Sequence, residues 1–223
     1  MTFELAIWFV FAYFLGAVPF GVLTARRYGV DLFQVGSGNV GATNVYRALG
    51  KKPALLVFVL DVLKGLVPAM IVRARTGSEE WALAVGLFAV LGHSLSPFLN
   101  FKGGKGISTG LGALLGSSPA VALSAFGAFL ISFGLSGYVS LSSVVSAVAM
   151  IGFGLLYGRS ATLMGVFGAL GVWVTVRHLP NIRRLLAGTE AKFSLSDSKE
   201  KAASQRGGPL ADAPEDPGGA SEK

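Results

Sequence analysis

The sequence predicts an all-α polytopic membrane protein with about seven transmembrane segments, one of them a short half-helix. Of the 223 residues, 52% are hydrophobic and only 14% are charged, whereas a soluble domain carries about 25% charged residues. Several apolar runs approach the roughly 20 residues that a spanning helix needs. Glycine accounts for 31 residues, about twice its usual share, which favours closely packed helices.

The first apolar run covers residues 5–25. Only Glu4 is charged before it, and the run lacks the basic start and the small-residue cleavage pattern of a signal peptide. Further runs cover about 54–72, 81–99, 107–117, 119–135, 138–157 and 160–177. The run at 107–117 rises only about 16 Å, too little for a bilayer core of about 30 Å. We therefore expect a half-helix there.

The distribution of basic residues orients these segments. Seven crossings with the N-terminus outside put only Arg73, Arg75 and Arg159 outside the cell. Ten basic residues then fall on the cytoplasmic side: Arg26, Arg27, Arg47, Lys51, Lys52, Lys102, Lys105, Arg177, Arg183 and Arg184. Since cytoplasmic loops carry an excess of Lys and Arg, we expect an external N-terminus and a cytoplasmic C-terminus.

The chain divides into two parts of different composition. Residues 1–191 hold all the apolar runs, and we expect them to form a single transmembrane domain. Residues 192–223 are rich in Pro, Gly, Ala, Ser and charge and show no apolar periodicity. Such a segment cannot bury enough surface to offset its ordering entropy. We expect it to be a disordered hydrophilic tail.

Composition also limits the chemistry. The chain has no cysteine and two histidines, so we expect no disulfide, no metal site and no cofactor. The basic excess belongs to the membrane part, so we expect membrane lipids as partners and no nucleic acid. The sequence does not reveal the oligomeric state.

The first chemical motif is GSGNVGATNVYR, residues 36–47. It matches the G-x-G-x-x-G dinucleotide fingerprint, but that motif needs a βαβ unit, and Asp61 lies inside an apolar run. The glycines let backbone N–H groups approach an anion. Polar groups beside them come from Ser37, Asn39, Thr43, Asn44 and Arg47. We favour a phosphate site here over an ordinary interfacial turn.

The second motif, FKGGKGIST at residues 101–109, opens the half-helix. Lys102 and Lys105 flank Gly103 and Gly104, where free N–H groups and the helix dipole favour negative charge. Lysines that merely obey the positive-inside rule would explain the charges but not the glycine spacing. We predict phosphate binding at this motif.

The third motif is RHLPNIRRLLAGTE, residues 177–190, with His178 and Asn181 about one helical turn apart. We expect Glu190 to form a salt bridge or a cap. Within apolar runs, Asp61 and Lys64 have the spacing of an intrahelical ion pair. His93 either supports the site or bonds a neighbouring helix, and Ser143 lies in a hydroxyl-rich turn that otherwise reads as a helix cap.

Together the motifs predict a site for phosphate-bearing substrates at the cytoplasmic membrane surface. The residues alone leave acyl transfer, phosphoryl transfer and anion transport open. The leading non-enzymatic alternative is a membrane transporter of a phosphorylated solute, which would need polar groups continuing across the membrane. A non-catalytic lipid-binding scaffold would explain the basic residues but not the Ser, Asn and Gly spacing.

The three motifs, in this order, resemble those of the PlsY family, the bacterial acyl-phosphate:glycerol-3-phosphate acyltransferases. The resemblance runs from about residue 5 to about residue 193. It implies an inner-membrane enzyme of phospholipid synthesis that moves a fatty acyl group from acyl phosphate to the 1-position of sn-glycerol 3-phosphate, giving lysophosphatidic acid and phosphate. The H-x-x-x-x-D motif of other glycerol phosphate acyltransferases is absent, because Phe98 and Arg183 lie five residues after the histidines.

The resemblance also implies roles for individual residues. His178, Ser37 and Asn181 are expected at the reacting groups, and His178 is the best protein candidate for assisting proton transfer. The expected substrate and phosphate ligands are Arg47, Lys105, Lys102, Ser143, Asn39, Asn44, Gly103 and Gly104. Glu190 and His93 are expected to give structural support.

Overall fold

The structure, a computed structural model, describes residues 2–193, and this part of the chain is helical with no β-strand. Its elements are α1 (Thr2–Ala17), α2 (Phe20–Arg26), α3 (Ala42–Leu49), α4 (Lys51–Thr76), α5 (Glu79–Ser94), the 3-10 helix η1 (Pro97–Leu99), α6 (Ile107–Ser117), α7 (Pro119–Ser136), α8 (Val139–Leu156), α9 (Ala161–Arg177) and α10 (Leu179–Leu186).

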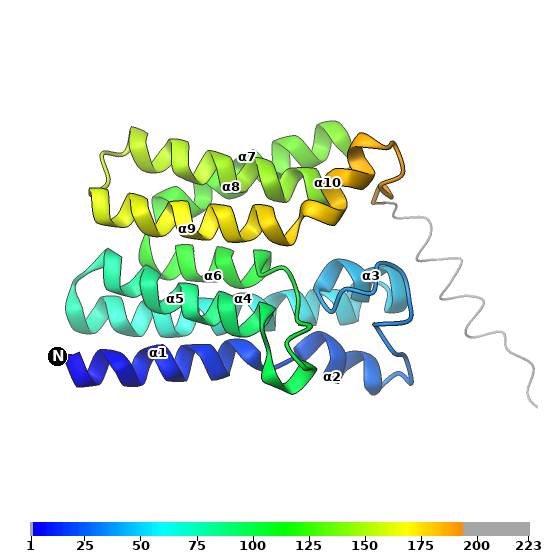
Figure 1. Ribbon diagram of the computed structural model, residues 1–223, viewed down its shortest axis with the longest axis horizontal. Coiled ribbons are helices and arrows are strands. Elements are labelled where there is room, and N and C mark those ends of the chain that lie inside the picture. The colour runs from blue at the N-terminus through cyan, green and yellow to red at the C-terminus, as the bar shows by residue number, and fades with distance from the viewer. Residues whose placement is uncertain (1, 194–223) are drawn as a thin grey trace, which may run out of the picture.

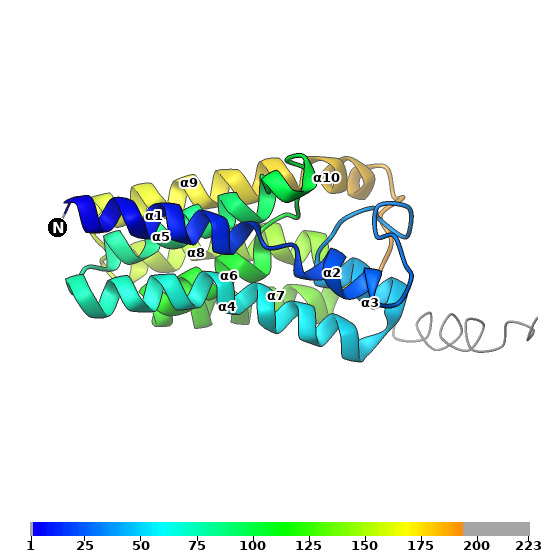
Figure 2. The same cartoon turned by 90° about the horizontal axis from the view of Figure 1, so that it is seen from below.

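The long helices run side by side along one axis in two groups (Figure 1). One group contains α1, α4, α5 and α6, and the other contains α7, α8 and α9. Both views place the N-terminus at one end of the bundle and α3 and α10 at the other (Figures 1 and 2). We call these the N-terminal end and the α10 end.

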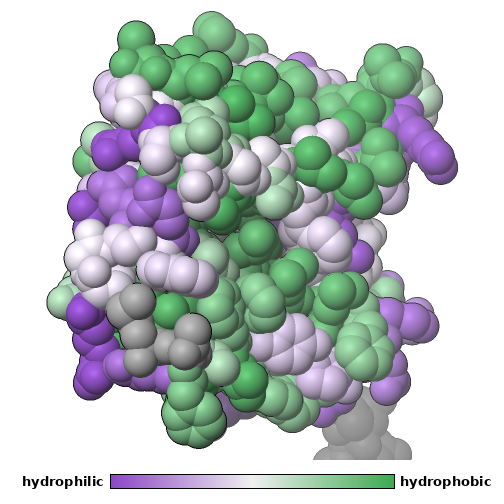
Figure 3. All heavy atoms as spheres, turned by 60° about the vertical axis from the view of Figure 1, so that its left-hand side comes forward, coloured by the Kyte–Doolittle hydropathy of each residue, from purple (hydrophilic) through white to green (hydrophobic). Residues whose placement is uncertain are grey.

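The elements match the predicted apolar runs. Five stretches are long and apolar enough to cross a membrane: Phe3–Arg26, Lys51–Thr76, Glu79–Leu99, Pro119–Ser136 and Val139–Leu156. The bent pair of α9 and α10 is a sixth, and α6 is the short apolar helix. Apolar residues cover much of the face seen in Figure 3, as lipid contact requires. The predicted fold class is therefore confirmed.

The first span is broken where it was predicted to be continuous. α1 ends at Ala17 and α2 begins at Phe20, with Pro19 between them. Proline has no N–H and clashes with the preceding turn, so it interrupts the helical hydrogen bonds. The ammonium group of Lys64 donates to the Val18 carbonyl oxygen at 3.2 Å, which satisfies one acceptor at the break.

Residues 26–53, between the first two apolar runs, contain a short helix, α3, that was not predicted from the sequence. α3 has eight residues, and two turns are too few to give a clear apolar period. Its Val45 is fully buried and packs in a cluster with Leu32, Ala54 and Val57. Tertiary packing on the start of α4 therefore stabilises this helix.

Glycines allow the short helix α6 to lie close against α4. A Cβ atom on Gly65 of α4 would overlap the Thr109 carbonyl oxygen, and one on Gly112 of α6 would overlap the Val62 carbonyl oxygen. The two backbones approach closely because both positions lack a side chain. This contact places the N-terminus of α6 inside the bundle.

Charged groups at the N-terminal end pair with one another. The Glu79 carboxylate lies 3.0 Å from Arg73 Nη2 and 3.1 Å from Arg159 Nη1, and it accepts a 2.8 Å hydrogen bond from the Ser118 hydroxyl. Glu79 thus joins α4, the start of α7 and the connection before α9. These charges hold helix ends together.

We expect Gly112→Ala to lower the free energy of unfolding by about 1–3 kcal/mol, because the added methyl group forces α6 away from α4. The matched control is Gly127→Ala in α7, where a Cβ atom meets no atom within 4 Å. Thermal unfolding in detergent measures both. Equal melting temperatures for the two variants would contradict the close α4–α6 contact.

Candidate active site

A cavity of about 300 Å³ lies at the α10 end of the bundle. Segments from all three motifs line it, together with the starts of α6 and α8 and the chain after α10. Its polar lining residues are Ser37, Asn39, Thr43, Asn44, Arg47, Asp61, His93, Lys105, Ser108, Ser140, Ser143, His178, Asn181 and Glu190. The fold therefore brings together groups up to about 150 positions apart in the sequence.

The loop of the first motif is shaped by two glycines and one asparagine. Gly36 and Gly38 have φ values of 58° and 68°, a region that glycine adopts without strain. Asn44 Oδ1 accepts the Ser37 N–H at 2.9 Å, and its Nδ2 donates to two loop carbonyls at 3.1 Å. Asn44, predicted as a substrate ligand, lines the cavity. These hydrogen bonds also make its amide the support of the loop that carries Ser37.

The glycine pair of the second motif does not offer its N–H groups to the cavity. The Gly103 N–H donates to the Ser94 carbonyl and the Gly104 N–H to the His93 carbonyl, each at 3.1 Å. Because these donors are already used and neither glycine lines the cavity, the structure gives no support to the phosphate contact predicted for Gly103 and Gly104. Lys102, also predicted as a ligand, is exposed and lies outside the lining.

Lys105 follows the glycine pair and does line the cavity. Its Nζ donates to Asn181 Oδ1 at 2.5 Å. Burial, more than the neighbouring charges, lowers the pKa of Lys105 to about 8. Beside it, α6 begins at Ile107 in the cavity wall, and no side chain of the described residues caps this end. The first N–H groups of α6 therefore add positive potential to the cavity.

His178 occupies the junction where α9 ends and α10 turns away by 57°. Its Nδ1 lies 2.8 Å from the Val174 carbonyl oxygen. Because a carbonyl only accepts, we assign the proton to Nδ1 and leave Nε2 as an acceptor.

Glu190 fixes the third motif. Its Oε1 accepts hydrogen bonds from Ser140 Oγ at 2.7 Å and Asn181 Nδ2 at 2.6 Å, and its Oε2 accepts from Arg184 Nε at 2.7 Å. Burial raises the pKa of Glu190, but these hydrogen bonds outweigh it and leave the pKa below its usual value. The carboxylate is therefore ionised at neutral pH, and it ties the start of α8 to α10.

Two further predicted residues, Ser143 and Arg47, line the cavity, and the side chain of each contacts a backbone carbonyl. Ser143 is buried, and its hydroxyl donates to the Val139 carbonyl at 2.8 Å. Arg47 is half-buried, and its Nη2 lies 3.4 Å from the Ala191 carbonyl oxygen. This long contact is weak, so the guanidinium remains available to an anion.

A buried charged cluster forms part of the cavity wall. Lys64 Nζ lies 2.8 Å from Asp61 Oδ1 and 2.8 Å from His93 Nδ1. The intrahelical pair expected from the spacing of Asp61 and Lys64 therefore forms, and His93 joins it from α5. Both Asp61 and His93 line the cavity.

The chain after α10 packs against the same end. The Phe193 N–H donates to the Gly137 carbonyl at 2.9 Å, and its ring lies 4.6 Å from the Tyr46 ring. The Lys192 ammonium lies 5.4 Å from the Tyr138 ring. The predicted tail begins at residue 192, but Lys192 and Phe193 pack on the bundle. The remaining residues of the predicted tail, 194–223, lie outside the described residues.

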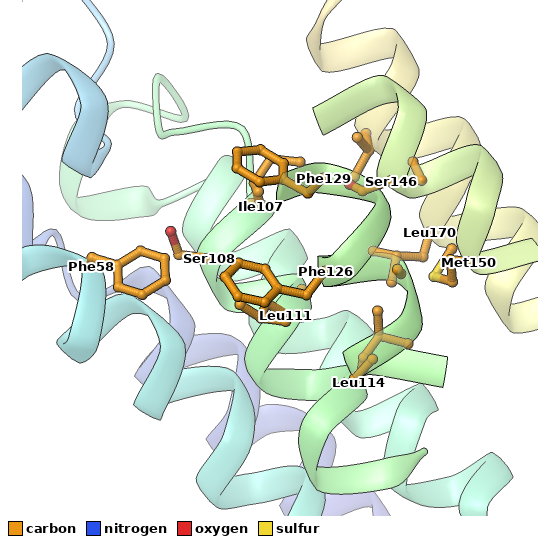
Figure 4. Close-up of a pocket in the computed structure, with 16 residues that line it drawn as sticks. Phe58, Ile107, Ser108, Leu111, Leu114, Phe126, Phe129, Ser146, Met150 and Leu170 are labelled. Atoms are coloured by element: carbon orange, nitrogen blue, oxygen red, sulfur yellow. The ribbon is translucent and has the colours of Figure 1, made fainter. Parts of the chain in front are cut away.

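A second, apolar pocket of about 100 Å³ adjoins the cavity (Figure 4). Phe58, Gly106, Ile107, Ser108 and Phe129 line both spaces. From there the pocket continues between α6, α7, α8 and α9, past Leu111, Leu114, Phe126, Met150 and Leu170. The site thus combines a cationic polar part with an apolar extension.

Sequence reasoning missed several residues of this site. Ser140 lies in the same hydroxyl-rich turn as Ser143, but its bond to Glu190 spans 50 positions. Phe58 and Phe129 lie in apolar runs, where nothing distinguishes them from lipid-facing residues. Arg177 was counted only as a cytoplasmic charge, yet it donates to two carbonyls of the glycine pair. Spacing gives no signal for contacts between distant segments.

The comparisons with known proteins agree with this geometry. A family model described as glycerol-3-phosphate acyltransferase matches residues 6–188. The chain is 46% identical over 185 residues to the glycerol-3-phosphate acyltransferase of Aquifex aeolicus, covering 82% of this chain and 96% of that protein. It is also 46% identical over 182 residues to that of Geobacter sulfurreducens, covering 82% and 94%.

Two solved structures share the fold. Both are crystal structures of PlsY (YgiH), described as an integral membrane glycerol 3-phosphate acyltransferase. The glycerol 3-phosphate form is 42% identical, with a TM-score of 0.84 over 87% of this chain and 98% of that chain. The lysophosphatidic acid form is 41% identical, with a TM-score of 0.81 over 88% and 99%.

These matches support the enzyme interpretation and give no support to the transporter alternative. The matched region includes the first two motifs, the third motif up to Gly188 and most of the cavity lining, whereas Glu190, Ala191 and Phe193 of the lining follow it. The chain belongs to the glycerol-3-phosphate acyltransferase family and is an integral membrane acyltransferase of the bacterial PlsY type.

Proposed function

We propose that this enzyme transfers a fatty acyl group from an acyl phosphate to the C1 hydroxyl of sn-glycerol 3-phosphate. The products are lysophosphatidic acid and inorganic phosphate. The observation that carries the proposal is a cavity with two basic side chains, Arg47 and Lys105, that adjoins an apolar pocket. The basic part suits phosphate groups, and the apolar part suits the hydrocarbon chain of a fatty acyl donor.

Phosphate binding is assigned to the positive groups of the cavity. Arg47 offers a planar fork of donors, Lys105 offers a point charge, and the start of α6 offers N–H groups. Ser37, Asn39 and Ser143 add polar groups within the same cavity. The same donors stabilise the oxyanion that forms when the acyl carbonyl is attacked.

The reaction needs no covalent enzyme intermediate. An acyl phosphate is already activated, so the C1 hydroxyl of glycerol 3-phosphate attacks its carbonyl carbon once the two are held together. The new ester C–O bond forms, and the bond between the acyl carbon and the phosphate oxygen breaks. Nε2 of neutral His178 accepts the hydroxyl hydrogen bond and orients it. The phosphate oxygen released from the acyl carbon takes the hydroxyl proton, so inorganic phosphate leaves protonated.

Asn181 and Glu190 act together in this scheme. Asn181 Oδ1 accepts from Lys105, and its Nδ2 donates to the Glu190 carboxylate. Glu190 is therefore a structural partner that holds the amide of Asn181 toward Lys105. His93 supports the wall through Lys64.

We place residues 1–191, as a single transmembrane domain, in the bacterial inner membrane with the site at the cytoplasmic surface. The motif-bearing α10 end carries ten of the thirteen basic residues that flank the spans. The positive-inside rule assigns the richer end to the cytoplasm. The N-terminus is then external.

The proposed reaction is tested with purified protein, glycerol 3-phosphate and either palmitoyl phosphate or palmitoyl-CoA. We expect equal amounts of 1-acyl lysophosphatidic acid and inorganic phosphate from the acyl phosphate alone. Arg47→Ala should lower kcat/KM for glycerol 3-phosphate roughly 10- to 100-fold, the effect of a lost charged hydrogen bond. The exposed Arg183 provides the matched control Arg183→Ala. Product from palmitoyl-CoA alone, or full activity of Arg47→Ala, would overturn the proposal.

The pKa of Lys105, about 8, predicts an alkaline limb in the pH profile. Substrate phosphate favours the ammonium form, so kcat/KM for glycerol 3-phosphate should fall as the pH rises through about 8 and Lys105 loses its proton. Lys105→Arg stays protonated throughout this range and should lose the limb. Initial rates across the alkaline range measure both proteins, and an identical limb in the variant would assign it to another group.

The apolar pocket predicts selectivity for chain length. Ala125 is buried in its wall, and Ala125→Leu should narrow the pocket and lower kcat/KM for palmitoyl phosphate about tenfold more than for octanoyl phosphate. Ala120→Leu, on an exposed position of the same helix, should leave the ratio unchanged. Equal losses with both donors would exclude this pocket as the chain site.

A further inference from the structure

The glycine pair of the second motif is held from the α5 side by His93. Its N–H groups bond to the carbonyls of His93 and Ser94. A Cβ atom on Gly104 would overlap His93 Nε2, and one on Gly103 would overlap the His93 carbonyl oxygen. The imidazole therefore packs directly on the backbone of Gly104, which tolerates no side chain there.

Behind His93, two buried charges fix the orientation of its ring. The Lys64 ammonium has only donors, so His93 Nδ1 accepts its hydrogen bond at 2.8 Å. Lys64 is held in turn by Asp61 at 2.8 Å and by the Val18 carbonyl at 3.2 Å. This face of the glycine pair thus rests on groups that have little freedom to move.

Arg177 holds the carbonyl groups of the pair. This last residue of α9 donates from Nη2 to the Gly103 carbonyl at 2.8 Å and to the Gly104 carbonyl at 3.0 Å. It does not line the cavity, and the proposed reaction gives it no role. Its backbone continues directly into His178, so one residue connects the glycine pair to the third motif.

These contacts determine the position of the Lys105 backbone. Lys105 follows Gly104 in the chain, and its ammonium reaches Asn181 Oδ1 at 2.5 Å. Glycine has the greatest backbone freedom of any residue, so two glycines before Lys105 would let it shift unless they are clamped. Displacement by about 1 Å at a reacting site lowers rates by up to about 100-fold.

We propose, on the basis of the proposed function, that Arg177 is a positioning residue for Lys105. Together with His93, it clamps the Gly103–Gly104 backbone and thereby holds the Lys105 ammonium at the phosphate site. It touches no substrate. Lysine replaces it only in part, because the single ammonium lacks the planar fork of guanidinium donors.

The test is a double-mutant cycle on kcat/KM for glycerol 3-phosphate with palmitoyl phosphate. Arg177→Gln should lower it about tenfold or more. In the Lys105→Ala background the same change should lower it less than about twofold, because no ammonium remains to be positioned. If the fold losses in kcat/KM of the two single variants multiply in the double variant, the two residues act independently and the proposal is overturned. Full activity of Arg177→Gln overturns it as well.

The matched control is Arg183→Gln, an exposed arginine at the same end, which should change kcat/KM less than about twofold in both backgrounds. Melting temperatures in detergent check folding. If Arg177→Gln does not fold, Arg177→Lys takes its place and should show the same coupling at smaller amplitude. Multiplying losses for Arg177→Lys overturn the proposal equally.

The pH profile gives a second readout that a purely structural role would not move. Arg177 contributes positive charge near Lys105, so Arg177→Gln should move the alkaline limb of kcat/KM above its wild-type position. An unmoved limb counts against positioning of Lys105.

Calorimetry also measures glycerol 3-phosphate binding to the four proteins of the cycle: wild type, Arg177→Gln, Lys105→Ala and the double variant. These measurements separate the positioning role of Arg177 from the proposed reaction. Coupling in binding without turnover of palmitoyl phosphate would remove the proposed donor and leave the positioning role standing. Turnover of palmitoyl phosphate without coupling between Arg177 and Lys105 would support the proposed reaction and overturn the positioning role.

Discussion

A lipid bilayer provides no water for a free peptide group, so irregular backbone survives at membrane depth only where protein or an aqueous cavity surrounds it. This constraint arranges the protein. The spanning segments are helices, whereas three irregular segments, 36–41, 100–106 and 187–193, gather at the α10 end with the cavity. The short helix α6 follows from the same constraint. Its N-terminus lies inside the bundle because the cavity, and not lipid, faces its free N–H groups.

Charge is used differently at the two ends. At the N-terminal end Glu79 pairs with Arg73 and Arg159, so these charges serve the fold. At the α10 end, within residues 2–193, Arg47 makes one long contact to a backbone carbonyl and Lys105 bonds to a neutral amide. Positive charge left without a carboxylate partner is expensive near a membrane unless a ligand supplies the anion. In the proposed reaction the substrate phosphates supply this anion.

Two neutral side chains of the site, those of His178 and Asn181, are oriented by hydrogen bonds to groups that take no part in the proposed reaction. Val174 fixes the tautomer of His178, and Glu190 fixes the amide of Asn181. Preorganised dipoles of this kind need little rearrangement during the reaction, which suits a substrate that is already activated.

The sequence by itself determined the fold class, the seven apolar segments and the family, because hydropathy and three ordered motifs are local patterns. It also singled out Arg47, Lys105, His178 and Asn181, which line one cavity. Only the tertiary structure decided how the other groups are used. The N–H groups of the glycine pair bond to α5, and the Asn44 amide bonds to its own loop. Hydrogen-bond partners are set by distances between segments far apart in the chain, and those distances arise when glycine-rich helices pack, which spacing along the chain does not encode.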